Sequence, residues 1–127
     1  MRKHHVYEKI HEYEVTRDEY LKNADEFLRE GKLRKASEFM WGAVALQIKR
    51  VALIMRREHL GTHKQITVFI KRLAESQNDK DLFKTFRFLE RLHTNFYDEE
   101  IEPDEFEIYR EEAHKFIRKL EDIIIKK

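Results

Sequence analysis

The 127-residue chain contains no cysteine, one proline and three glycines. The absence of cysteine excludes a disulfide framework, a thiolate metal site and a cysteine nucleophile. Because proline and glycine are so rare, few positions force a helix to end. Asparagine and glutamine are also scarce, with three residues of each. The composition therefore favours long helices and removes several classes of reactive site.

Long hydrophobic runs are missing as well. No apolar stretch approaches the ~20 residues that span a bilayer. The N-terminal segment MRKHHVYEKIHEYE lacks the apolar core of a signal peptide. No glycine-rich phosphate loop and no serine-nucleophile motif occurs. We therefore expect a cytoplasmic protein without a membrane segment and without a cofactor.

Charged residues make up 40% of the chain, and 41% of the residues are hydrophobic, a balance typical of a folded domain. The formal net charge of +1 argues against strong non-specific binding of nucleic acid. The charges are nevertheless segregated, because residues 49–72 contain seven Lys or Arg against Glu58, whereas residues 98–112 contain nine acidic residues against Arg110. Abundant Lys, Arg and Glu are common in proteins from hot environments and in helical bundles generally.

The segment 32–57 is the most hydrophobic part of the chain, and its stretch Phe39–Ile48 carries no charge. Apolar residues cover every side of its helical wheel, so other helices must surround it. We predict an all-α fold, an up-and-down bundle of about five helices with this long second helix at its centre. The length suits one domain, residues 1–127.

Helices are predicted at 16–30, 32–57, 63–76, 79–97 and 103–126, with residues 1–15 forming an arm or a short helix. The boundaries follow capping and breaking residues. These are Thr16 with Glu19 as a capping box, Gly31 at the end of the first helix, Thr62 before the third, Asn78 or Asp79 before the fourth, and Pro103 at the start of the last.

Three residues of the central helix are interpreted structurally. Gly42 lies mid-helix, where glycine is unfavourable, and indicates a closely packed neighbouring helix. Trp41 is expected to anchor the core or an interface. Gln47 is expected to be a buried amide with its hydrogen bonds satisfied.

Short connections predict antiparallel neighbouring helices. In that order the second helix ends at the same pole where the third begins and the fourth ends. The residues expected to meet there are Arg56, Arg57, His59, His63, Lys64, His93 and the acidic stretch 98–105. This convergence indicates either a functional site or an intramolecular charge network.

His93 is the residue best suited to chemistry. It lies on the apolar face of the fourth predicted helix, with Glu90 one turn earlier, and is interpreted either as a core histidine with one hydrogen bond or as a reactive group. Arg87 and Arg91 lie one turn apart on that helix and are either solvated or bind an anion. Several hydrogen-bonding groups follow within one turn, in the segment HTNFY.

The stretches GKLRKASEFMWGAVALQIK and RLHTNFYDE resemble the archaeal paralogous-repeat (PaREP) family. The resemblance extends from Thr16 to about Ile125. That family is similar in turn to the HEPN class of helical bundles, which often dimerise. The class includes metal-independent ribonucleases and nucleotide-binding or accessory modules, so the resemblance implies a homodimer and an RNA-related role.

HEPN ribonucleases use an arginine followed at short spacing by a histidine, and Arg87 and His93 fit this pattern with five residues between them. The resemblance implies that His93 is the acid/base group and that Arg87 stabilises charge on the phosphate. It also implies that Asn95 and Tyr97 orient the phosphate or the histidine. The chain departs from the pattern at Phe88, where a polar residue is usual, and in the position of Tyr97.

Metal binding is not predicted, because Gly61 interrupts the pair His59 and His63 and no carboxylate completes a site nearby. Three hypotheses remain. The first is a non-catalytic module that binds RNA, a nucleotide or a protein partner. Its anion-binding residues are Arg56, Arg57, His63, Lys64 and Arg91. The second is a metal-independent ribonuclease centred on Arg87 and His93, and the third is a structural helical domain with no site.

Overall fold

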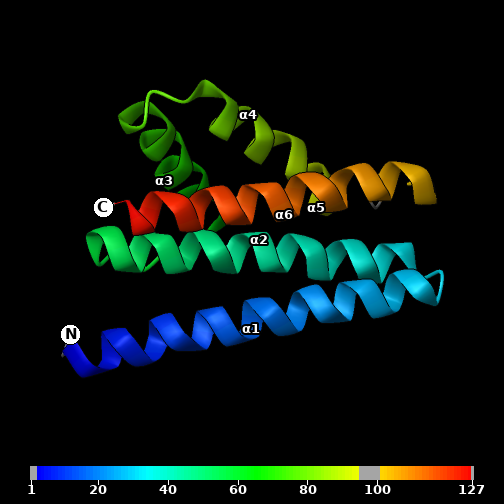
Figure 1. The fold of residues 1–127 in the computed structure, drawn as a ribbon, viewed down its shortest axis with the longest axis horizontal. Coiled ribbons are helices and arrows are strands. Elements are labelled where there is room, and N and C mark those ends of the chain that lie inside the picture. Colours follow the sequence, from blue (N-terminus) through cyan, green and yellow to red (C-terminus); the bar gives the residue numbers. More distant parts are fainter. Residues whose placement is uncertain (1–2, 95–100, 127) are drawn as a thin grey trace.

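The computed structural model describes residues 3–94 and 101–126 and is built from α-helices within those ranges (Figure 1). The predicted all-α bundle is confirmed. The helices are α1 (Lys3–Arg29), α2 (Leu33–Arg56), α3 (His63–Ser76), α4 (Lys80–Leu89), α5 (Arg91–Thr94) and α6 (Pro103–Ile125). None of the helices in the described ranges is long and apolar enough to cross a membrane.

Helix α2 lies at the centre, as its sequence predicts. It packs between α1 and α6, and the three long helices lie side by side in Figure 1. Helices α3 and α5 also contact α2. Buried side chains occur all along α2, from Ala36 to Leu53, because neighbours cover most of its circumference.

Helix α1 begins at Lys3, so the predicted helix start at Thr16 is wrong. Residues 3–15, predicted as an arm or a short helix, are helical and continuous with residues 16–29. Thr16 lies in the middle of the helix and caps nothing. Val6 is buried, and Ile10 and Tyr13 are half-buried, at the spacing of one helical face. This face packs against the C-terminal half of α2. The packing stabilises the N-terminal part of α1 despite its charged, irregular sequence, because tertiary packing contributes more to the stability of a helix than intrinsic helix propensity does.

Two glycines of the α1–α2 hairpin behave as predicted. Gly31 adopts a left-handed conformation, with φ of +75°, where α1 ends. At Gly42 an added Cβ would lie 2.8 Å from Cδ2 of Tyr20, a residue of α1. The absence of a side chain at Gly42 therefore allows the Tyr20 ring to pack directly on the backbone of α2.

The connector Arg57–Thr62 runs back along α2. Arg57 has a left-handed φ of 54° and turns the chain out of the helix, while Leu60 is buried. As a result α3 begins beside Trp41 rather than beside the end of α2, with the ring centroids of Trp41 and His63 5.7 Å apart. Thr62 forms the predicted cap, accepting a hydrogen bond from the backbone N–H of Gln65 at 3.1 Å.

The predicted helix 79–97 is interrupted. Asp79 caps α4 by accepting a hydrogen bond from the Leu82 N–H at 3.2 Å, as one of the two predicted alternatives. Helix α4 ends at Leu89, and the single turn α5 follows Glu90. The Glu90 carbonyl accepts hydrogen bonds from the N–H groups of both His93 and Thr94, which tightens the chain at this point. Residues 95–97 lie outside the described ranges.

Helix α6 runs in the same direction as α2 (Figure 1). Pro103 is at its start, as predicted, together with Asp104 and Glu105. This acidic start lies at the opposite end of the bundle from Arg56 and Arg57, at the C-terminal end of α2. The predicted meeting of the basic and acidic segments at one pole is therefore wrong for the described residues, because the connector and α6 do not follow simple alternation.

Candidate functional site

Four aromatic rings from four helices meet on one side of α2. The indole of Trp41 lies 5.8 Å from the imidazole of His93, nearly parallel to it at 17°. The His63 and His93 rings are 6.0 Å apart, and the Phe86 ring packs behind Trp41 at 5.8 Å. Trp41 is buried, as expected for a core anchor, whereas His63 and His93 are exposed. The buried indole thus provides a rigid support for two accessible imidazoles.

Glu90 connects His63 to Arg87. One carboxylate oxygen lies 2.5 Å from Nε2 of His63, and the other accepts a hydrogen bond from Nη1 of Arg87 at 2.7 Å. The Glu90 side chain is only 11% exposed, against 45% for His63 and 54% for Arg87. A buried carboxylate needs such partners, and in turn it orients both of them. We call Trp41, His63, Arg87, Glu90 and His93 the His63–His93 cluster.

Arg87 is also held from its other side. Its guanidinium lies over the Phe83 ring, 4.9 Å from the centroid, in a cation–π contact. The side chain is therefore fixed between a carboxylate and an aromatic face while about half of it stays exposed. This arrangement leaves guanidinium N–H groups directed at solvent beside the two histidines. Such a group is a suitable donor for a phosphate oxygen.

The match to a family model covers residues 12–117, described as the archaeal PaREP1/PaREP8 family. The chain belongs to this family. The matched range contains every residue of the His63–His93 cluster. No curated protein and no solved structure matches the chain.

The predicted site residues fall into three groups in this PaREP1/PaREP8 protein. Arg87, His93 and His63 come together in the cluster, and Lys64 is exposed in the first turn of α3 next to His63. Arg91 is exposed in α5. Arg56 and Arg57 lie fifteen residues or more beyond Trp41, about 22 Å along the axis of α2 at 1.5 Å per residue, and do not join the cluster. Asn95 and Tyr97 lie outside the described residues.

Sequence reasoning missed the role of Glu90, and it predicted Trp41 as an anchor without its ring contacts to His63 and His93. Arg87 and Glu90 are three residues apart on a helix, a spacing that indicates an ion pair. The contact of Glu90 with His63 of α3 has no comparable signal in the sequence, because the two residues are 27 positions apart. Within residues 3–94 and 101–126, no group of three or more His, Asp or Glu side chains is placed to hold a metal ion.

A second polar network holds α1, α2 and α6 together. The Gln47 amide donates to Oε1 of Glu121 at 2.8 Å and to the carbonyl of Ile117 at 3.2 Å, and its oxygen accepts from Arg17 at 2.8 Å. Arg50 also donates to Glu121. The expectation that Gln47 is a satisfied buried amide is confirmed. Gln47 is fully buried where these helices meet, so the network links α1, α2 and α6 through the core.

Ionisable groups elsewhere have shifted pKa values. The hydrogen bond from Arg110 lowers the pKa of Asp25, and the one from Lys119 lowers the pKa of Asp79. Burial lowers the pKa of His114, and the nearby Arg110 acts in the same direction. These residues connect α6 to α1 and to the α3–α4 loop. They contribute to the pH dependence of stability rather than to the His63–His93 cluster.

Proposed function

We propose that this protein binds single-stranded RNA through its phosphates at the His63–His93 cluster. The observation that supports this proposal is that Arg87 and His63 share one buried carboxylate, that of Glu90, while His93 stacks beside His63 and all three side chains stay accessible. Arginine and imidazole N–H groups are suitable donors to phosphate oxygens. The orientation imposed by Glu90 reduces the entropy lost when these donors engage a ligand.

Binding to RNA is favoured over a purely structural role because the arginine and imidazole side chains of the cluster, which can donate hydrogen bonds, are exposed to solvent. Glu90 is buried and contacts two partners, His63 and Arg87, that are themselves about half exposed. Lys64 and Arg91 add two exposed cations in neighbouring turns. The resemblance to HEPN-like bundles supports the same class of ligand.

The binding test is an affinity measurement with unstructured RNA at several salt concentrations. Arg87→Gln is expected to weaken binding and to make the dependence on salt less steep, because one phosphate contact is lost. Arg29→Gln is the matched control, since Arg29 is exposed in the last turn of α1, a helix that contributes no residue to the cluster. Equal effects of the two substitutions, or affinity independent of salt, would exclude phosphate binding at the cluster.

A second candidate function is metal-independent RNA cleavage, which the separation of the two imidazoles favours. Ring centroids 6.0 Å apart allow one histidine to take the proton of the ribose 2′-hydroxyl while the other protonates the leaving 5′-oxygen. The 2′-oxygen would form a bond to phosphorus as the bond from phosphorus to the 5′-oxygen breaks. Arg87 would stabilise the charge that develops on the phosphoryl oxygens.

Cleavage is tested by incubating RNA with the protein in EDTA. The cleavage hypothesis expects the wild type to produce fragments and His93→Ala to lose nearly all of that activity. The control is His11→Ala, because His11 is an exposed histidine on α1. If neither protein cleaves, or if wild type and His93→Ala cleave equally, His93 is excluded as a catalytic residue.

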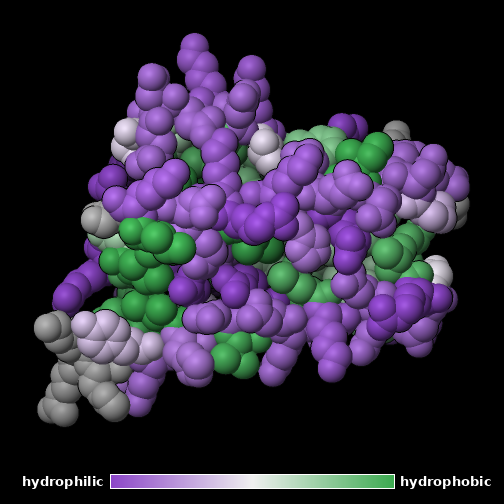
Figure 2. Space-filling view, viewed as in Figure 1, coloured by the Kyte–Doolittle hydropathy of each residue, from purple (hydrophilic) through white to green (hydrophobic). Residues whose placement is uncertain are grey.

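A homodimer remains part of the proposal. Hydrophobic side chains gather over the end of the bundle where α1 begins and α2 and α6 end (Figure 2). Tyr7 is 61% exposed and Ile125 is 77% exposed near that end. Ile125→Glu is expected to shift a dimer toward monomer in light scattering at micromolar concentration. An unchanged mass would exclude this end as the interface.

A further inference from the structure

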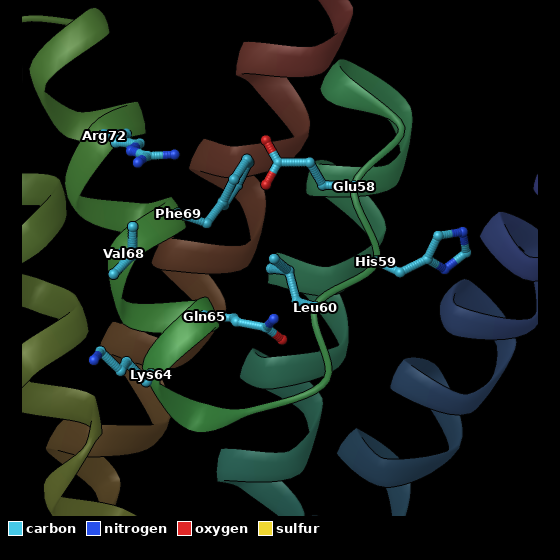
Figure 3. Close-up of a pocket in the computed structure, with 8 residues that line it drawn as sticks. All are labelled: Glu58, His59, Leu60, Lys64, Gln65, Val68, Phe69 and Arg72. Atoms are coloured by element: carbon cyan, nitrogen blue, oxygen red, sulfur yellow. The ribbon is translucent and has the colours of Figure 1, made fainter.

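A groove separates the connector from α3, next to the His63–His93 cluster. Its volume is about 340 Å³, within the range of small-molecule sites. One wall is formed by Glu58–Leu60, and the other by one face of α3 that starts at Lys64, the residue after His63. Its lining residues, shown in Figure 3, are Glu58, His59, Leu60, Lys64, Gln65, Val68, Phe69 and Arg72. We call this feature the α3 groove.

Opposite charges face each other across one end of the α3 groove. In Figure 3, Glu58 points inward from the connector and Arg72 points toward it from α3, with Phe69 and Leu60 beneath them. Within the residues that the structure describes, neither side chain has an ion-pair partner. Phe69 and Leu60 are buried, so the floor of the groove is apolar. His59 points away, toward α1 (Figure 3).

We propose that the α3 groove binds the guanine base of a nucleotide, which deepens and rests on the proposed binding of RNA. Guanine carries adjacent N–H donors at N1 and N2 on one edge, which fit a carboxylate such as that of Glu58. Its acceptors O6 and N7 lie on another edge and fit the guanidinium of Arg72. The flat face of the base would cover Leu60, Phe69 and Val68.

Adenine does not fit the same walls. It lacks an N–H at N1, so the Glu58 carboxylate would face an acceptor, and its 6-amino group would face the cationic Arg72. A pyrimidine covers less of the apolar floor and offers a carboxylate at most one ring N–H or one amino group. The arrangement of one acid and one arginine therefore selects guanine among the four bases.

The position of Lys64 connects the base to the cluster. Lys64 lies two helical turns from Arg72 on α3, about 12 Å along the axis, and is adjacent in sequence to His63. A guanine held between Glu58 and Arg72 would direct its phosphate along α3 toward Lys64 and the His63–His93 cluster. The groove then serves as the base-reading part of a binding surface whose phosphate-binding part is the cluster.

The test is calorimetric titration of the full chain with GMP, IMP and AMP at low salt. GMP should bind best, IMP less tightly because it lacks the amino group at N2, and AMP at least about tenfold more weakly than GMP, the effect of one lost bidentate contact. Glu58→Gln should remove most of the preference for GMP over AMP, and Arg72→Gln should weaken GMP binding by a similar factor.

Lys71→Gln is the matched control, because Lys71 is an exposed cation next to Arg72 that does not line the groove. It should change GMP affinity by no more than about twofold, the effect of a screened surface charge. The substituted side chains are on the surface, and melting curves verify that each variant is folded. No binding of GMP at millimolar concentration, equal binding of AMP, or equal effects of Lys71→Gln and Arg72→Gln overturns the proposal. A free apolar amino acid could also fit the groove, because its ammonium and carboxylate groups match Glu58 and Arg72. Tighter binding of such an amino acid than of GMP also overturns the proposal.

The two proposals fail separately. If Arg87→Gln weakens RNA binding but GMP does not bind, the guanine site is wrong and the cluster stands. If GMP binds through Glu58 and Arg72 while RNA binding ignores Arg87, the cluster is wrong as the phosphate site.

Discussion

Nε2 of His63 lies 2.5 Å from a carboxylate oxygen of Glu90, across 27 positions of sequence. This contact joins the start of α3 to the break between α4 and α5. It also determines where the accessible imidazole of His63 stands relative to His93 and Arg87. The functional proposals and the first prediction depend on this relationship.

Removing the Glu90 carboxylate should destabilise the protein. Glu90→Ala leaves His63 and Arg87 without their shared acceptor, so we expect the free energy of unfolding to fall by about 1–3 kcal/mol, measured by urea denaturation. Glu75→Ala, at an exposed position of α3, should change it by no more than about 0.5 kcal/mol. Comparable losses in both variants would mean that Glu90 does not organise the cluster.

The basic residues at the end of α2 should matter less for RNA than Arg87. The double substitution Arg56→Gln with Arg57→Gln removes two charges about 22 Å from Trp41 along α2. We expect it to weaken RNA binding less than the single substitution Arg87→Gln, because distant exposed charges are screened by salt. Fluorescence anisotropy at 0.15 M salt measures the ranking. The reverse ranking would place the contact surface at the end of α2.

Gly42→Ala should have opposite effects in two backgrounds. In the wild type the new Cβ would lie 2.8 Å from the Tyr20 ring, so the ring must move and the protein should lose stability despite the better helix propensity of alanine. In Tyr20→Ala the obstacle is absent, and the same substitution should stabilise by about 1 kcal/mol. Thermal unfolding of the four proteins gives this double-mutant cycle. The same sign in both backgrounds would contradict the close packing.

Acidification should destabilise the protein in part through His114. Burial keeps the pKa of the His114 imidazole in the folded protein below its ordinary value of 6.5. The unfolded chain therefore binds the extra proton first, and the free energy of unfolding falls as the pH drops from about 6.5 toward the folded-state pKa. The lowered pKa values of Asp25 and Asp79 extend this loss below pH 3.8.

His114→Phe should flatten the pH dependence just below pH 6.5 while leaving the part below pH 3.8 in place. The measurement is urea denaturation at pH values from 3 to 8. His11→Phe is the control, because His11 is exposed. If the free energy of unfolding of His114→Phe depends on pH just below 6.5 as steeply as that of the wild type, another group titrates there.

Local sequence signals determined much of the fold. The uncharged, all-round apolar pattern of 32–57 identified α2 as the central helix, and capping residues Thr62, Asp79 and Pro103 gave the starts of α3, α4 and α6. These signals act within about one helical turn, so they can be read directly from neighbouring residues. The pairing of Arg87 with His93 came instead from the resemblance to the HEPN ribonuclease pattern.

The tertiary structure decided which of those residues meet. Burial of Leu60 along α2 returns the chain to Trp41, and this brings His63, not Arg56 or Arg57, to His93. Packing against α2 likewise extends α1 to Lys3, where the sequence offers only the short apolar face of Val6, Ile10 and Tyr13. The direction of a connector depends on the sum of many distant contacts rather than on any local pattern. For this reason the sequence alone contained the members of the site but not the contact between His63 and Glu90 that assembles it.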